Sequence, residues 1–128
     1  MKPIRVPQFS IITATYNSAR TINQTIDSLL AQTFKNFEIL IIDGLSTDDT
    51  IKIIKSYNDS RINVYSETDK GIYDAFNKGI YRSIGGIIGF LHSDDTFYND
   101  NVLSDIYNSF DSQIDGVYGD FNYVSSDT

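Results

Sequence analysis

Residues 9–17 read FSIITATYN, and the alternation of strands and helices begins there. Its first five residues, 9–13, are mostly apolar or β-branched, which predicts a short strand buried on both faces. Asn17 or Ser18 is expected to cap the helix that follows. Apolar residues then recur at helical spacing, at Ile22, Ile26, Leu29 and Leu30. The chain therefore opens as a strand followed by an amphipathic helix.

The same alternation continues along the chain. Further strands are predicted at residues 37–42, 62–66, 87–91 and about 116–119, and further helices at about 51–57, 72–84 and 99–110. Ser46 and Asp49 have the spacing of a capping box, and Gly85 and Gly86 are expected to end the third helix. The alternation predicts an α/β, Rossmann-like fold in three layers, with helices on both faces of a mostly parallel sheet.

Composition narrows the possible functions. The 128 residues suit a single domain spanning 1–128, and the formal net charge of −7 argues against binding to nucleic acid. The absence of cysteine excludes disulfides, thiolate metal sites and cysteine nucleophiles. No apolar run is long enough to span a membrane, and the start lacks a signal core. We expect a cytoplasmic protein, with peripheral association at the inner face of the membrane through a partner or a further segment.

Polar residues gather where the first and fourth strands end. In the dinucleotide-binding strand order these strands are neighbours, and ligands bind beyond their carboxyl ends. Residues 13–17 follow the first strand, and Asp94 and Asp95 follow the fourth. Two adjacent carboxylates repel each other, and Mg²⁺ or Mn²⁺ bound with phosphate oxygens would offset that repulsion. A turn whose aspartates cap the next helix is the alternative.

Four other side chains have both a functional and a structural interpretation. Asp43 could accept a hydrogen bond from a ribose hydroxyl or a base N–H, or could cap its loop. Tyr16 could stack on a nucleobase or pack against the protein. Lys70, near a helix start, could reach a phosphate or remain a surface lysine. His92 could be a metal ligand or a structural residue.

Two residues inside the predicted helix 72–84 break local preference. Asn77 and Gly79 both cost helix stability, and such breaks often mark close packing or a site. The sequence also contains neither GxGxxG after the first strand nor GxxxxGK[ST]. Their absence weakens dinucleotide-binding and P-loop interpretations.

Taken together, these segments resemble glycosyltransferase family 2, which has the GT-A fold. The resemblance covers about residues 8–120. Its segments, in order, are 9–17 (FSIITATYN), 28–34 (SLLAQTF), 37–50 (FEILIIDGLSTDDT), 69–75 (DKGIYDA), 77–79 (NKG) and 90–95 (FLHSDD). Each segment alone is weak, whereas the ordered set is specific.

The resemblance implies a nucleotide-diphosphate sugar donor, often a UDP-sugar, and a divalent metal, Mn²⁺ or Mg²⁺. It implies that Asp43 binds the base and that Asp94 and Asp95 contact the metal, with Asp94 also at the nucleotide sugar. His92 stands where the family usually has the first acid of this motif. The remaining residues expected in the nucleotide-sugar site are Thr13, Ala14, Thr15, Tyr16, Asn17, Lys70 and Gly71.

The implied reaction is an inverting transfer of sugar to a glycan or polysaccharide acceptor. The family's catalytic base is an aspartate well past the metal motif, and Asp115, Asp120 and Asp127 lack its context, so the catalytic residue stays unknown. We therefore expect a donor-binding part that is incomplete at its C-terminus. Unpaired strand edges could then drive homo-oligomer formation.

Two alternatives remain open. One is a non-catalytic nucleotide-sugar-binding fragment that lacks the acceptor half and the base. The other is a phosphoacceptor receiver domain, which would need acids after the first strand, where this chain has Thr13, Ala14 and Thr15.

Overall fold

The computed structural model describes residues 7–109 of the chain. Strands and helices alternate as β1 (Phe9–Thr15), α1 (Ile22–Leu30), β2 (Phe37–Asp43), α2 (Thr50–Lys55), β3 (Ile62–Ser66), α3 (Ile72–Arg82), β4 (Ile87–Phe90) and α4 (Val102–Ser109). The predicted alternation is thus confirmed from the first strand to the fourth helix. The strand predicted at 116–119 lies outside the described residues.

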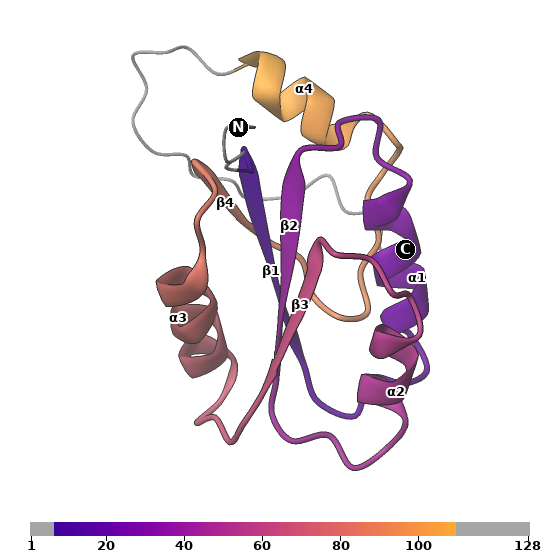
Figure 1. Ribbon diagram of the computed structural model, residues 1–128, viewed down its shortest axis with the longest axis vertical. Helices are drawn as coiled ribbons and strands as arrows, with labels where there is room; N and C mark the ends of the chain where they lie inside the picture. The colour runs from indigo at the N-terminus through magenta and orange to yellow at the C-terminus, as the bar shows by residue number, and fades with distance from the viewer. Residues whose placement is uncertain (1–6, 110–128) are drawn as a thin grey trace, which may run out of the picture.

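The four strands form one parallel sheet in the order β3-β2-β1-β4. Helices α1 and α2 cover one face and α3 covers the other, which gives the predicted three layers (Figure 1). The register places Thr15 opposite Asp43, and Asp43 opposite Ser66. The prediction that β1 and β4 are neighbours is confirmed. Strands β1, β2 and β3 end at the lower edge in Figure 1, and the shorter β4, parallel to β1, ends opposite Ile12.

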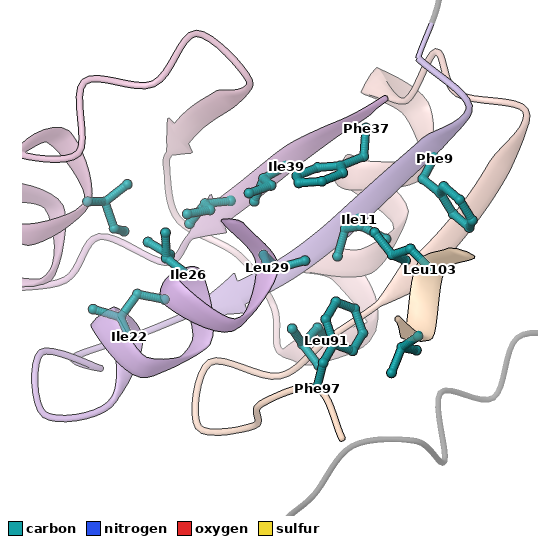
Figure 2. Packing of buried hydrophobic residues seen from close by; sticks show 13 residues of the cluster. Phe9, Ile11, Ile22, Ile26, Leu29, Phe37, Ile39, Leu91, Phe97 and Leu103 are labelled. Atoms are coloured by element: carbon teal, nitrogen blue, oxygen red, sulfur yellow. The ribbon is translucent and has the colours of Figure 1, made fainter. Parts of the chain in front are cut away.

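The core lies on both faces of the two central strands. Ile11 and Ile39 pack with Ile26 and Leu29 on the face that α1 covers (Figure 2). Ile12, Leu40 and Ile42 pack with Ala75 beneath α3. Each fully buried aliphatic side chain contributes about 1.5–3 kcal/mol. Two-sided burial explains why β1 and β2 read as continuous apolar runs rather than alternating ones.

Gly79 marks the close packing that its place inside α3 predicted. A Cβ built on Gly79 would lie 3.0 Å from both Cγ1 and Cδ1 of Ile12, a buried side chain of β1. The helix therefore approaches the sheet more closely than a side chain at this position would allow. Asn77 is exposed and takes no part in this contact.

The predicted cap of α1 is wrong. Helix α1 begins at Ile22 with Thr21 before it, and neither Asn17 nor Ser18 caps it. The backbone of Asn17 has φ 49°, and its Oδ1 accepts the N–H of Thr47 at 2.8 Å. Asn17 therefore joins the loop after β1 to the loop after β2 instead of starting the helix.

The predicted capping box is also wrong. Asp49 makes no side-chain cap hydrogen bond to α2, and the Ser46 hydroxyl instead donates to Asp43. Asp48 takes over locally, because its Oδ1 accepts the N–H of Thr50 at 3.0 Å. The hydrogen bond from Ser46 to the buried carboxylate of Asp43 forms in place of the capping-box contact that the spacing of Ser46 and Asp49 predicts.

The glycine pair does not end α3. That helix ends at Arg82, and the following Ser83 is already extended, with ψ 143°. A Cβ on Gly85 would lie 2.6 Å from the carbonyl carbon of Phe9, so this glycine lets the chain pass beside β1.

Candidate functional site

The loops that follow β1 and β4 meet at the carboxyl edge of the sheet. The hydroxyl oxygens of Ser18 and Ser93 lie 2.8 Å apart, and the Thr21 hydroxyl donates to the Ser93 carbonyl at 2.9 Å. Tyr16 and Asp94 lie within two residues of these contacts, and both side chains are exposed. The juxtaposition predicted from topology is therefore present.

Helix α1 fixes the segment that carries the acid pair. Thr25, which is fully buried, donates to the carbonyls of Ser93 and Asp95. Further along the same helix, Ser28 accepts the N–H of Phe97, and Gln32 just past the helix bonds to the backbone of residues 99 and 103. Sequence reasoning missed these residues. The available signal was the run of polar positions 21, 25, 28 and 32, which keeps helical spacing beside the apolar stripe.

Asp43 is the most heavily hydrogen-bonded carboxylate of the site. Its Oδ1 accepts from Thr15 Oγ1 at 2.7 Å and from Ser46 Oγ at 2.5 Å. Its Oδ2 accepts from the Ser46 N–H at 2.8 Å and from Ser66 Oγ at 2.9 Å. The side chain is fully buried. This carboxylate joins the ends of three neighbouring strands.

Asn17 extends this network to the loop after β1. Its N–H donates to Ser46 Oγ at 2.8 Å, and the N–H of Ser18 donates to Thr50 Oγ1 at 2.8 Å. The exposed ring of Tyr16 is thus held on a backbone that contacts the loop after β2 at several points. Such fixed geometry suits a binding surface, because little order has to be gained on binding.

The segment between β3 and α3 is tied to the start of that helix. The N–H of Lys70 donates to Asp74 Oδ2 at 2.8 Å, and its side chain is exposed. Gly71 has φ 114°, a backbone conformation that favours glycine, and lies directly before the helix. Lys78 bonds back to the Thr68 carbonyl and lies 3.6 Å from Glu67. The anchoring role of Lys78 was not predicted from sequence.

Asp94 and Asp95 form an adjacent acid pair at the end of β4. Burial, and then repulsion by Asp94, raise the pKa of the Asp95 carboxyl above its ordinary value, while His92 opposes the shift. The His92 ring is exposed, with its centroid 5.9 Å from that of Phe76. Within residues 7–109 no group of three or more His, Asp or Glu side chains could hold a metal.

This donor set still fits Mg²⁺ or Mn²⁺. Such ions commonly take one or two carboxylates and complete their coordination with phosphate oxygens and water. Burial and repulsion by Asp94 both raise the pKa of Asp95, and a bound cation would offset the repulsion between the two carboxylates.

The other predicted residues of β1 differ in accessibility. Thr13 and Thr15 are buried, Ala14 is half-buried, and Tyr16 and Asn17 are exposed. Among the described residues, the Thr13 hydroxyl is the buried side-chain group that has no hydrogen-bond partner. The exposed part of this segment is therefore its last two residues. A separate cavity of about 320 Å³ between α2 and β3 is lined by none of the predicted site residues.

Comparison with known proteins identifies the family. Residues 10–128 match the model of glycosyl transferase family 2. The chain is 40% identical over 99 residues to WfaP of Escherichia coli, described as a UDP-Glc:alpha-D-GlcNAc-diphosphoundecaprenol beta-1,3-glucosyltransferase. It is 38% identical over 99 residues to TuaG of Bacillus subtilis, described as a putative teichuronic acid biosynthesis glycosyltransferase. These alignments cover 77% and 75% of this chain but 39% of each relative.

Solved structures give the same result for the fold. The crystal structure of S. aureus TarS 1-349 in complex with UDP-GlcNAc matches with a TM-score of 0.75 and 30% identity, over 79% of this chain and 30% of that one. In residues 7–109 no helix is both long and apolar enough to cross a membrane. The family match also decides against the receiver-domain alternative. The chain belongs to glycosyl transferase family 2, and its parallel sheet is the GT-A type.

Proposed function

We propose that this chain binds the sugar donor of a glycosyltransferase, a nucleotide-diphosphate sugar of the UDP type. The observation that carries the proposal is the Ser18–Ser93 contact, which brings the exposed Tyr16 and the Asp94–Asp95 pair to one edge of the sheet. The relatives support it, since WfaP is named for a UDP-Glc donor and TarS was crystallised with UDP-GlcNAc.

The nucleoside is expected on the segment that follows β1. Its residues are Thr13, Ala14, Thr15, Tyr16 and Asn17. The Tyr16 ring offers a stacking surface, while the buried threonines shape the strand beneath it. Asp43 belongs to the same site, and its contact with the base remains a prediction.

The diphosphate is expected between the start of α3 and the acid pair. Lys70 supplies a cation, and Gly71 lies directly before the first residue of α3, where anions are favoured. Asp94 and Asp95 would hold the divalent metal, and Asp94 would also lie at the nucleotide sugar. When bound, the metal stabilises the charge that develops on the leaving diphosphate.

The proposed reaction is inverting displacement at the anomeric carbon. The acceptor hydroxyl attacks that carbon, a base takes the hydroxyl proton, and the bond to the diphosphate oxygen breaks. Among the described residues we assign no base. Asp115, Asp120 and Asp127 lie outside the described residues. We propose a glycan or polysaccharide acceptor, cytoplasmic action with peripheral attachment to the inner membrane face, and self-association.

A second candidate is donor binding without transfer. It is favoured by length, because the chain spans 39% of WfaP and 30% of the TarS 1-349 chain. On this account residues 1–128 act as a single donor-binding domain, without transfer of sugar to an acceptor. The two candidates predict the same nucleotide site and differ in turnover.

Calorimetric titration with UDP, GDP and dTDP, each with Mn²⁺ and with EDTA, tests the proposal. We expect UDP to bind, and to bind more tightly with Mn²⁺. The variant Asp94→Asn should remove most of the Mn²⁺ effect, while Asp105→Asn on α4, a matched loss of one charge, should keep it. Binding of none of the three nucleotides would refute the proposal. Incubation with UDP-sugars and acceptors then separates the two candidates.

A further inference from the structure

The carboxylate of Asp43 has no free acceptor position for a ligand. A carboxylate offers about four lone-pair sites. Protein donors occupy two positions on each oxygen of Asp43, and no part of the side chain is exposed. A nucleobase N–H could bind there only by displacing one of these donors, and the hydroxyl of Thr15 among them is buried.

Asp69 is the next carboxylate at this edge. A Cβ built on Gly44 would lie 2.8 Å from Oδ2 of Asp69, so this carboxylate fills the space that any side chain at position 44 would need. Oδ1 of Asp69 accepts the N–H of Gly71 at 3.1 Å. Oδ2 accepts no hydrogen bond within residues 7–109. Asp69 is half-buried, so the residue is partly open to solvent.

Tyr16, Gly44 and Asp69 follow three neighbouring strand ends. The N–H of Gly44 donates to the Thr15 carbonyl at 2.9 Å, which carries the β1–β2 ladder one residue beyond the last pair. Tyr16 and Gly44 therefore leave the sheet side by side. An exposed ring and a carboxylate with one free oxygen are groups that can hold a flat base with an N–H on its edge.

We propose that Asp69 is the residue that recognises the nucleobase, by accepting the N3–H of uracil. Asp43 is then a positioning residue, which holds the strand ends that carry Tyr16 and Gly44. This assignment rests on the proposed function. It also predicts base selectivity. Uracil presents a donor at N3, whereas cytosine presents an acceptor there, which a carboxylate repels.

The test compares UDP with CDP on the wild-type chain and on Asp69→Asn, by calorimetry with Mn²⁺. The asparagine Oδ1 can still accept the Gly71 N–H, while its NH₂ group offers a donor in place of the free acceptor. Wild type should prefer UDP by about tenfold or more, as a hydrogen bond to a charged group predicts. In Asp69→Asn this ratio should fall at least about tenfold, with CDP binding retained or improved.

Controls separate this inference from the proposed function. Asp69→Ser keeps an acceptor for the Gly71 N–H and should also lose selectivity, whereas Asp105→Asn should keep the wild-type ratio. An unchanged ratio in both Asp69 variants would overturn the assignment while leaving donor binding intact. Equal binding of UDP and CDP by wild type would overturn it too. Failure of wild type to bind UDP at all refutes the proposed function instead.

Discussion

The Thr25 hydroxyl oxygen lies 2.6 Å from the carbonyl oxygen of Asp95, to which it donates a hydrogen bond. The same hydroxyl lies 3.0 Å from the carbonyl of Ser93. Thr25 is fully buried in α1, so a helix of the first β–α unit sets the backbone of an acid pair that follows the fourth strand. The position of the proposed metal ligands thus depends on a side chain that bonds to the backbone of their loop.

Replacing Thr25 by valine should therefore affect both stability and metal use. Valine keeps the shape but leaves the carbonyl of Asp95 without its donor, while the carbonyl of Ser93 keeps the Thr21 hydroxyl, and the loss costs about 1–3 kcal/mol of unfolding free energy. Mn²⁺-dependent UDP binding should weaken as the loop loosens. Urea denaturation and calorimetry measure the two effects. Thr25→Ser keeps the hydroxyl and should lie close to wild type, and equal behaviour of the two variants would contradict the proposed contact.

Asp43 should be the most costly carboxylate of the site to remove. Asp43→Ala leaves four donors without this acceptor, three side-chain hydroxyls and one backbone N–H, around a fully buried position. We expect a loss of about 3 kcal/mol or more in urea denaturation. Asp49→Ala, on an exposed side chain without a cap hydrogen bond, is the control and should change stability by at most about 0.5 kcal/mol. A loss below about 1 kcal/mol for Asp43→Ala would show that the network is weak.

The substitution Gly79→Ala has two opposing effects on stability, one through helix propensity and one through packing. Alanine favours a helix over glycine by about 1 kcal/mol, whereas the added Cβ presses on Ile12, a buried side chain that cannot move aside. Overpacking costs about 1–3 kcal/mol, so we expect packing to win and the melting temperature to fall. Gly86→Ala is the control, because a Cβ there lies 3.8 Å from the Gln8 carbonyl oxygen, an ordinary contact. A variant at position 79 more stable than wild type would mean that α3 lies further from β1.

The sequence predicted the fold better than the local details of the site. Apolar periodicity was enough to predict the strands, because burial on both faces leaves continuous apolar runs such as those of β1 and β2. Topology alone then predicted that the ends of β1 and β4 meet. The cap of α1 was missed because Asn17 bonds to Thr47, a residue distant in the chain, and the capping box was wrong because Ser46 bonds back to the buried Asp43 instead.

The predicted site residues show the same limit. Position at a strand end correctly placed Tyr16 and Asp94 on the carboxyl edge, yet it could not show that Asp43 is surrounded by protein donors. That saturation depends on Ser66, which reaches Asp43 only through the β2–β3 register. Position at a strand end also could not show that Asp69 fills the space above Gly44. These residues are 25 positions apart, and no local pattern encodes their contact.

The acid pair should make the metal-free chain less stable as pH rises. The pKa of Asp95 is raised above the ordinary 3.8 in the folded state. At pH values between 3.8 and the pKa of the folded state, the folded chain therefore binds more protons than the unfolded chain. Unfolding free energy from this group therefore falls as pH rises through that window and stays low above it. Asp95→Asn removes the titrating group. In EDTA, the unfolding free energy of Asp95→Asn should therefore rise relative to that of wild type as pH increases through this window. The difference should persist at neutral pH.

Mn²⁺ should reverse the order of stability of wild type and Asp95→Asn. A ligand that binds only the folded state stabilises it by RT ln(1 + [L]/Kd), a gain that wild type obtains and Asp95→Asn largely loses. Thermal melts at neutral pH with Mn²⁺ and UDP should thus place wild type above the variant, and melts in EDTA should place it below. Asp105→Asn, which also removes one negative charge, should follow wild type in both conditions. If Asp95→Asn were less stable than wild type in EDTA as well, Asp95 would be stabilising the fold, and the case for a cation held by this pair would fail.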